Sequence, residues 1–123
     1  MVPKLLENKN VSVNLEFVYD VAASDSSFIE LMIKTFLTGM PATMQKIRTF
    51  CEAADWDGLA KTAHFAKSSY SIVSIYGMLD IIKEIECSAR TKSNLQKLPN
   101  LVSAAESLFK HAEELLLLHF PQK

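Results

Sequence analysis

One histidine in this sequence has neighbours suited to chemistry on a protein surface. His64 lies in the run Thr62–Tyr70, whose apolar residues recur at helical spacing. At about 100° per residue, His64 points roughly 140° away from Leu59 on the apolar stripe of that helix. The positions three, four or seven residues away are small or basic, namely Ala60, Lys61, Lys67, Ser68 and Ser71. The pattern predicts an exposed imidazole with lysines beside it and no bulky side chain covering it.

An exposed imidazole beside ammonium groups is suited to phosphoryl transfer. A neutral ring has one nitrogen with a free lone pair, and positive charge near the transferred group stabilises the transition state. Lys67, one turn after His64, is placed to reach phosphoryl oxygens, and Ser68 and Ser71 carry hydroxyls on the same side. The sequence contains no Gly-rich phosphate loop and no Gly-Lys-Ser/Thr motif. Nothing in the sequence therefore indicates an ATP-binding site.

Other catalytic chemistries have less support in the residue pattern. A di-iron bundle needs Glu-x-x-His pairs on two helices, and the sequence has none. It also lacks a hydroxyl nucleophile on a sharp strand-to-helix turn. The remaining histidines, His111 and His119, are without the lysines and small residues that surround His64. We therefore expect no metal site in this chain.

The run Ala63-His64-Phe65-Ala66-Lys67-Ser68-Ser69 resembles the signature of the histidine phosphotransfer (HPt) family, Ala-His-x-Leu-Lys-Gly-Ser/Ala. Two positions depart from that signature, since Ala66 stands at the usual leucine and Ser68 at the usual glycine. Ser68 lies one turn from the histidine, where a partner must approach closely, and serine is the next smallest polar choice. The resemblance also includes Ile85-Glu86, which matches a Leu-Glu pair of the family, and covers about residues 13–92.

The resemblance implies a phosphorelay intermediate of two-component signal transduction, a phosphocarrier without ATP binding. His64 would accept a phosphoryl group from the aspartyl phosphate of a receiver domain and pass it to another receiver domain. Lys67 would stabilise the phosphoryl charge, and Ser68 would be the close-approach position. The implied partners are receiver domains of a hybrid sensor kinase or of a response regulator, and the Mg²⁺ belongs to the receiver, so no cofactor is expected here. The residues expected to contribute to partner docking are Lys61, Phe65, Ser71 and Ile72.

Two alternative functions stay open. The first is a non-catalytic, HPt-like helical adaptor in which Ser68 crowds the site. The second is the dimerisation and phosphoacceptor segment of a sensor kinase, although such segments usually follow their histidine with an acidic residue and Phe65 follows His64 here. The sequence equally allows a free-standing shuttle or the C-terminal domain of a hybrid kinase.

Size and charge narrow the class of protein. At 123 residues with 49% hydrophobic residues, the chain is expected to be one domain that buries a substantial core. A net charge of -1 argues against a nucleic-acid partner or an anionic membrane surface. No signal peptide or membrane-spanning run is evident, and Cys51 and Cys87 are expected to be buried thiols. We expect a cytoplasmic monomer without membrane insertion.

The spacing of apolar residues predicts an all-α fold, an up-and-down antiparallel four-helix bundle with a short N-terminal covering helix. The bundle is expected over residues 13–120, after a polar lead-in at residues 1–12. Asn14 is expected to cap the covering helix, and a cap cluster at Ser24–Ser27 opens the first long helix. Pro41 interrupts that run, so either one bent helix or two abutting helices satisfy the pattern.

The remaining helices are predicted from caps and periodicity in the same way. Asp55 is expected to cap the histidine helix, which runs to about Val73 or Ser74. Ile75 is expected to open the apolar face of the next helix. The last helix should begin between Ser93 and Pro99, with a core seam of Leu98, Val102, Ala105, Phe109, Ala112 and Leu116.

Overall fold

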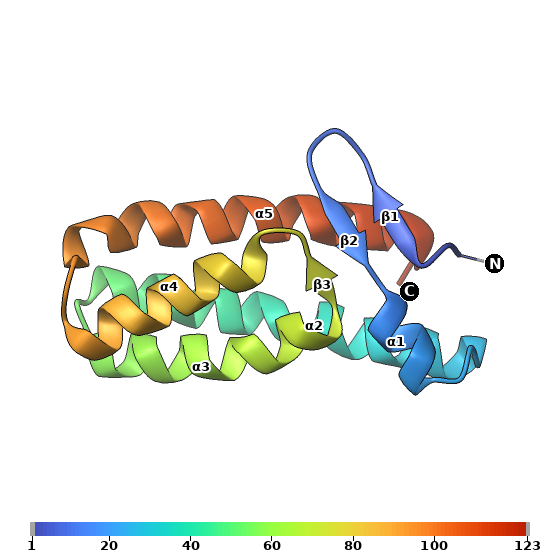
Figure 1. The fold of residues 1–123 in the computed structure, drawn as a ribbon, viewed down its shortest axis with the longest axis horizontal. Helices are drawn as coiled ribbons and strands as arrows, with labels where there is room; N and C mark the ends of the chain where they lie inside the picture. The colour runs from blue at the N-terminus through green and yellow to red at the C-terminus, as the bar shows by residue number, and fades with distance from the viewer. Residues whose placement is uncertain (1, 123) are drawn as a thin grey trace.

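The computed structural model describes residues 2–122. Its strands are β1 (Leu5–Glu7), β2 (Ser12–Asn14) and β3 (Ser74–Ile75). Its helices are α1 (Glu16–Val21), α2 (Ser26–Glu52), α3 (Trp56–Ile72), α4 (Met78–Thr91) and α5 (Leu98–His119), with a short 3-10 helix, η1 (Leu95–Lys97), before α5. Figure 1 shows α2, α3, α4 and α5 side by side along the long axis, each running opposite to the one before it. The predicted up-and-down four-helix bundle is confirmed.

Local sequence signals account for where the long helices begin. The Asp25 carboxylate accepts hydrogen bonds from the backbone N–H groups of Ser27 and Phe28 at the start of α2. The Asp55 carboxylate accepts one from Gly58 N–H, at 3.0 Å, at the start of α3. Each carboxylate satisfies N–H groups that a helix start leaves without an intrahelical partner. Pro41 lies inside α2, which is one continuous helix.

The apolar stripes meet in a single core. All six residues predicted for the seam of the last helix are buried on α5. The core face of α3 is buried at Leu59, Ala63, Ala66 and Tyr70. The small side chains of α3 suit a close approach of the neighbouring helix, and α3 packs most extensively against α4. The histidine helix is thus held by its core face, and its opposite face remains exposed.

A small antiparallel sheet lies beside α5, where α3 ends and α4 begins (Figure 1), and was not predicted. Its strand order is β1-β2-β3, with Leu6 opposite Val13 and Val13 opposite Ile75. Leu6 and Val13 are buried, so part of the segment interpreted as a polar lead-in covers the core. The expectation that Ile75 opens the next helix was wrong, because Ile75 belongs to β3. Helix α4 begins only after Gly77, whose φ of 85° is in the left-handed region that favours glycine.

The expectation of two buried thiols was wrong for one of them. Cys51 is a buried thiol as predicted, but Cys87 is exposed on α4. Its position follows Glu86 on the helix, one step away from the apolar stripe that includes Ile85 and Ala89. In the described part of the chain, no helix is long and apolar enough to cross a membrane.

Two neighbouring leucines test whether the sheet contributes to stability. Leu6 is buried and its neighbour Leu5 is 49% exposed, so Leu6→Ala should lower the free energy of unfolding by about 2–4 kcal/mol. Leu5→Ala removes the same atoms from an exposed position and should change it by less than about 0.5 kcal/mol. Urea unfolding measures both. Equal small effects would show that β1 does not belong to the cooperative core.

Candidate functional site

His64 lies on the exposed face of α3 and is held by a residue of α4. Its side chain is 64% exposed, whereas the adjacent Ala63 and Ala66 are fully buried against the core. Nδ1 of His64 lies 2.8 Å from Oε2 of Glu86 on α4. The close packing of α3 on α4 brings these residues, 22 positions apart in the chain, into hydrogen-bond contact.

Glu86 is a buried carboxylate that three side chains contact. Oε1 of Glu86 accepts a hydrogen bond from Nζ of Lys67 at 2.6 Å. Oε2 accepts from Arg90, at 2.6 Å, as well as from His64. Only 4% of Glu86 is exposed to solvent, so these partners replace the water that an ionised carboxylate would otherwise bind.

The charge state of Glu86 follows from these contacts. Burial acts to raise the pKa of Glu86, but the hydrogen bonds from Lys67 and His64 and the charges of Lys67 and Arg90 outweigh it. The pKa of Glu86 therefore lies below the ordinary glutamate value, and the side chain is a carboxylate at neutral pH.

An ionised Glu86 determines which imidazole nitrogen carries the proton. A carboxylate only accepts hydrogen bonds, so Nδ1 of His64 must be the donor in the contact with Oε2. In the neutral ring, the lone pair is then on Nε2. The arrangement matches the way a carboxylate orients the histidine of a catalytic triad. The site therefore presents an exposed imidazole whose free lone pair is on Nε2.

The other residues singled out from the sequence occupy different surroundings. Lys67 is 28% exposed in its side chain and bonded to Glu86, while Lys61 and Ser68 are exposed on α3. The Ser71 hydroxyl is exposed and donates to the Lys67 carbonyl at 2.8 Å. Among the residues that the structure describes, no group of three or more His, Cys, Asp and Glu side chains is placed to hold a metal ion.

Glu86 and Arg90 are the site residues that sequence reasoning missed. The sequence did contain a signal, because Glu86 lies at a helical position beside Ile82, Ile85 and Ala89, on the buried stripe of α4. A charged side chain on such a stripe requires a partner with hydrogen-bond donors. The partner could not be read from α4 alone, since two of the three donors come from α3.

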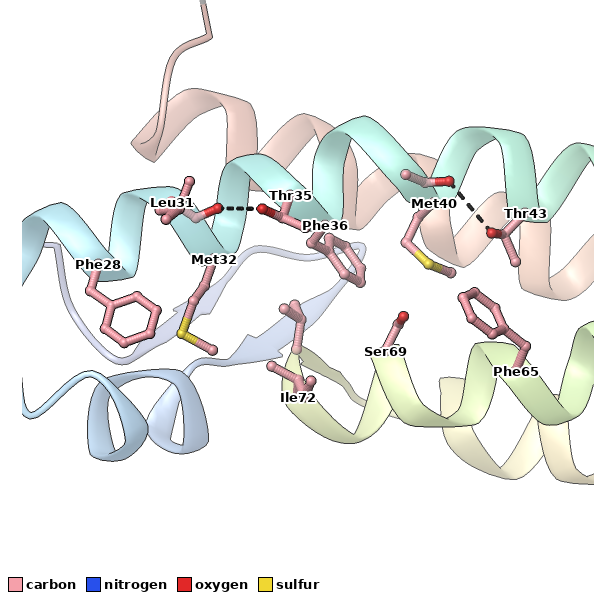
Figure 2. A pocket seen from close by; sticks show the side chains of 12 residues that line it. Phe28, Leu31, Met32, Thr35, Phe36, Met40, Thr43, Phe65, Ser69 and Ile72 are labelled. Carbon is pink, nitrogen blue, oxygen red and sulfur yellow. Dashed lines mark hydrogen bonds between the residues drawn. The ribbon is translucent and has the colours of Figure 1, made fainter.

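An apolar groove of about 440 Å³ lies between α2 and α3 beside the histidine. Figure 2 shows Phe65 and Ser69 of α3 directed toward Met40 and Thr43 of α2, with Phe28 and Leu31 farther along α2. Phe65 directly follows His64 and is 64% exposed, and Ile72 is 36% exposed. The two apolar residues expected to contribute to partner docking, Phe65 and Ile72, thus both have exposed side chains. The lining residues are Phe28, Leu31, Met32, Thr35, Phe36, Gly39, Met40, Thr43, Phe65, Ser69, Ile72 and Val73.

Two solved structures share this architecture. The histidine-containing phosphotransfer protein B of Pseudomonas aeruginosa matches with a TM-score of 0.79 and 20% identity, over 93% of this chain and 96% of that one. The HPt domain of a sensor hybrid histidine kinase from Shewanella matches with a TM-score of 0.70 and 20% identity, over 89% and 96%. No protein-family model matches the sequence, and a search of curated proteins finds no match. The chain therefore has the fold of histidine phosphotransfer domains.

The hydrogen bond from His64 to Glu86 makes a prediction about the imidazole. In ¹⁵N NMR spectra at about pH 8.5, where a histidine ring is ordinarily neutral, His64 should carry its proton on Nδ1. Glu86→Ala removes the acceptor, so the ring should become a mixture of the two neutral tautomers. The matched control is Glu84→Ala, an exposed glutamate on the same helix. Unchanged tautomer populations in Glu86→Ala would show that Glu86 does not orient the ring.

Proposed function

We propose that this chain is a phosphorelay intermediate, in which His64 accepts a phosphoryl group from the aspartyl phosphate of one receiver domain and passes it to another. One observation carries the proposal, namely the contact between His64 Nδ1 and the buried Glu86 carboxylate. That contact leaves the lone pair on Nε2 of a side chain that is 64% exposed. A partner protein can therefore reach the nucleophile from solvent.

The transfer step is an in-line displacement at phosphorus. The Nε2 lone pair of His64 forms the N–P bond while the P–O bond to the receiver's aspartate breaks, and the bonding electrons leave with the aspartyl carboxylate. The Nδ1 proton stays on the ring, so the phosphorylated imidazole carries positive charge next to Glu86. That carboxylate stabilises the product electrostatically. The same step in reverse, toward a second receiver, returns the ring to its starting form.

Lys67 and Arg90 stabilise different negative charges, those of the phosphoryl group and of Glu86. Lys67 lies one turn after His64 and is partly exposed while bonded to Glu86. Its flexible stem lets the ammonium group turn toward the phosphoryl oxygens once the N–P bond begins to form. Arg90 stays bonded to Oε2 of Glu86, so the buried carboxylate keeps a cationic partner when Lys67 moves.

The partner in this relay is a receiver domain, which supplies the phosphoryl group and docks beside His64. The receiver brings the aspartyl phosphate and its Mg²⁺, and the relay operates in the cytoplasm with this chain as a monomer. The apolar groove that begins at Phe65 provides a docking surface beside the nucleophile. Ile72 extends that surface, and the exposed Lys61, Ser68 and Ser71 surround the histidine on α3.

A non-catalytic adaptor is the second candidate function. It is favoured by Ser68, which is exposed on α3 one turn from His64. Because HPt domains usually have glycine there, the hydroxymethyl group of Ser68 would crowd the approach of a receiver domain in this alternative. An adaptor of this kind would bind receiver domains without accepting phosphoryl groups.

Phosphoryl incorporation into His64 variants tests the proposal against the adaptor. A panel of receiver domains, each phosphorylated with acetyl phosphate and Mg²⁺, should label the wild-type chain. His64→Gln should abolish labelling because it removes the nucleophilic nitrogen, and an exposed helical position should tolerate the change within about 0.5 kcal/mol. His111→Gln and His119→Gln are matched controls and should retain full labelling. Label that persists in folded His64→Gln would overturn the site, and no labelling of wild type by any receiver would favour the adaptor.

A further inference from the structure

No feature of the chain itself requires a glycine at position 39. It lies near the middle of α2, where glycine is less stable than alanine because it loses more backbone freedom on folding. Its φ is not in the positive region, so alanine can adopt the same backbone conformation. A Cβ added at Gly39 would meet no atom within 4 Å. Neither backbone conformation nor packing inside the described chain therefore explains the glycine.

Gly39 does line the groove between α2 and α3. None of the groove's lining residues is charged. The Thr35 hydroxyl donates to the Leu31 carbonyl at 2.8 Å, and the Thr43 hydroxyl faces the Gly39 carbonyl at 3.5 Å (Figure 2). Both threonine hydroxyls are therefore directed to the backbone of α2. Because Gly39 has no side chain, the backbone of α2 is uncovered at this point of the apolar wall.

The shape of the groove selects the kind of segment that fits it. Its walls are two α-helices, whose backbone groups are bonded within each helix, so they offer no sheet edge to an extended peptide. From Phe28 to Thr43 the α2 wall extends over about four turns, or about 22 Å. An amphipathic helix with apolar residues one turn apart matches this length and this lining.

We propose that Gly39 is a specificity-determining position, at which an apolar helix of the donor receiver domain packs directly on the backbone of α2. The inference rests on the proposed function and adds to it the position along α2 at which the partner's helix packs. The groove begins at Phe65, the residue after His64. A helix lying in the groove would therefore end beside the site of transfer. A residue without a side chain lets two helices approach more closely than any other residue does. Contact with the partner's helix would compensate for the lower helix stability that glycine causes in the free chain.

The test uses the opposite effects that one methyl group should have on stability and on docking. Gly39→Ala should raise the thermal midpoint by about 2–4 °C, because alanine favours the helix and its Cβ meets open space. It should also lower the second-order rate of transfer from the receiver that labels wild type fastest, by about tenfold. Gly39→Leu fills more of the groove and should lower that rate further. Thr38→Leu, at an exposed neighbour outside the groove lining, is the matched control and should transfer at the wild-type rate.

Labelling by phosphoramidate, a small donor that needs no docking, separates docking from chemistry. Wild type, Gly39→Ala and Gly39→Leu should all be labelled on His64 at the same rate. Wild-type transfer rates from the receiver in both Gly39 variants would overturn this inference and leave the proposed function intact. A loss of phosphoramidate labelling in step with receiver transfer would also overturn it, because Gly39 would then act on His64 itself. Failure of every receiver to label wild type would overturn both.

Discussion

The contact on which this site depends is the one between the buried Glu86 carboxylate and its three donors. A lone carboxylate in that position would be protonated or would disrupt the packing of α4. Hydrogen bonds from His64, Lys67 and Arg90 keep it ionised despite its burial. The same contact assigns the Nδ1 proton and leaves the lone pair on Nε2. One carboxylate thus links the helix packing to the chemistry of the exposed histidine.

The bundle provides what this carboxylate requires. The small residues Ala63 and Ala66 are fully buried on α3, which packs closely on α4 and brings Glu86 to the base of the imidazole. The opposite face of α3 stays open, and beside it α2 and α3 leave an apolar groove uncovered. A stable core and an exposed histidine therefore come from two faces of one helix. Gly39 adds a position where the free chain forgoes helix stability on the wall of that groove.

Much of this could be predicted from the sequence, and the exceptions share a physical reason. The caps at Asp25 and Asp55 and the seam of α5 depend on residues within a few turns of one another, so local patterns reveal them. The sheet joins Val13 to Ile75 through strands of two or three residues, which are too short for an alternating pattern to be recognised. Glu86 likewise acquires its role from α3. Its place on an apolar stripe indicated a buried charge but not the residues that satisfy it.

The measurement that tests this account most directly is the identity of the phosphorylated atom. ³¹P and ¹⁵N NMR of the ¹⁵N-histidine-labelled chain, after transfer from a receiver domain, distinguish the two possible N–P bonds. The account predicts phosphorus on Nε2 of His64, with Nδ1 still protonated beside Glu86. Phosphorus on Nδ1 of His64, or on any other residue of the chain, would contradict it.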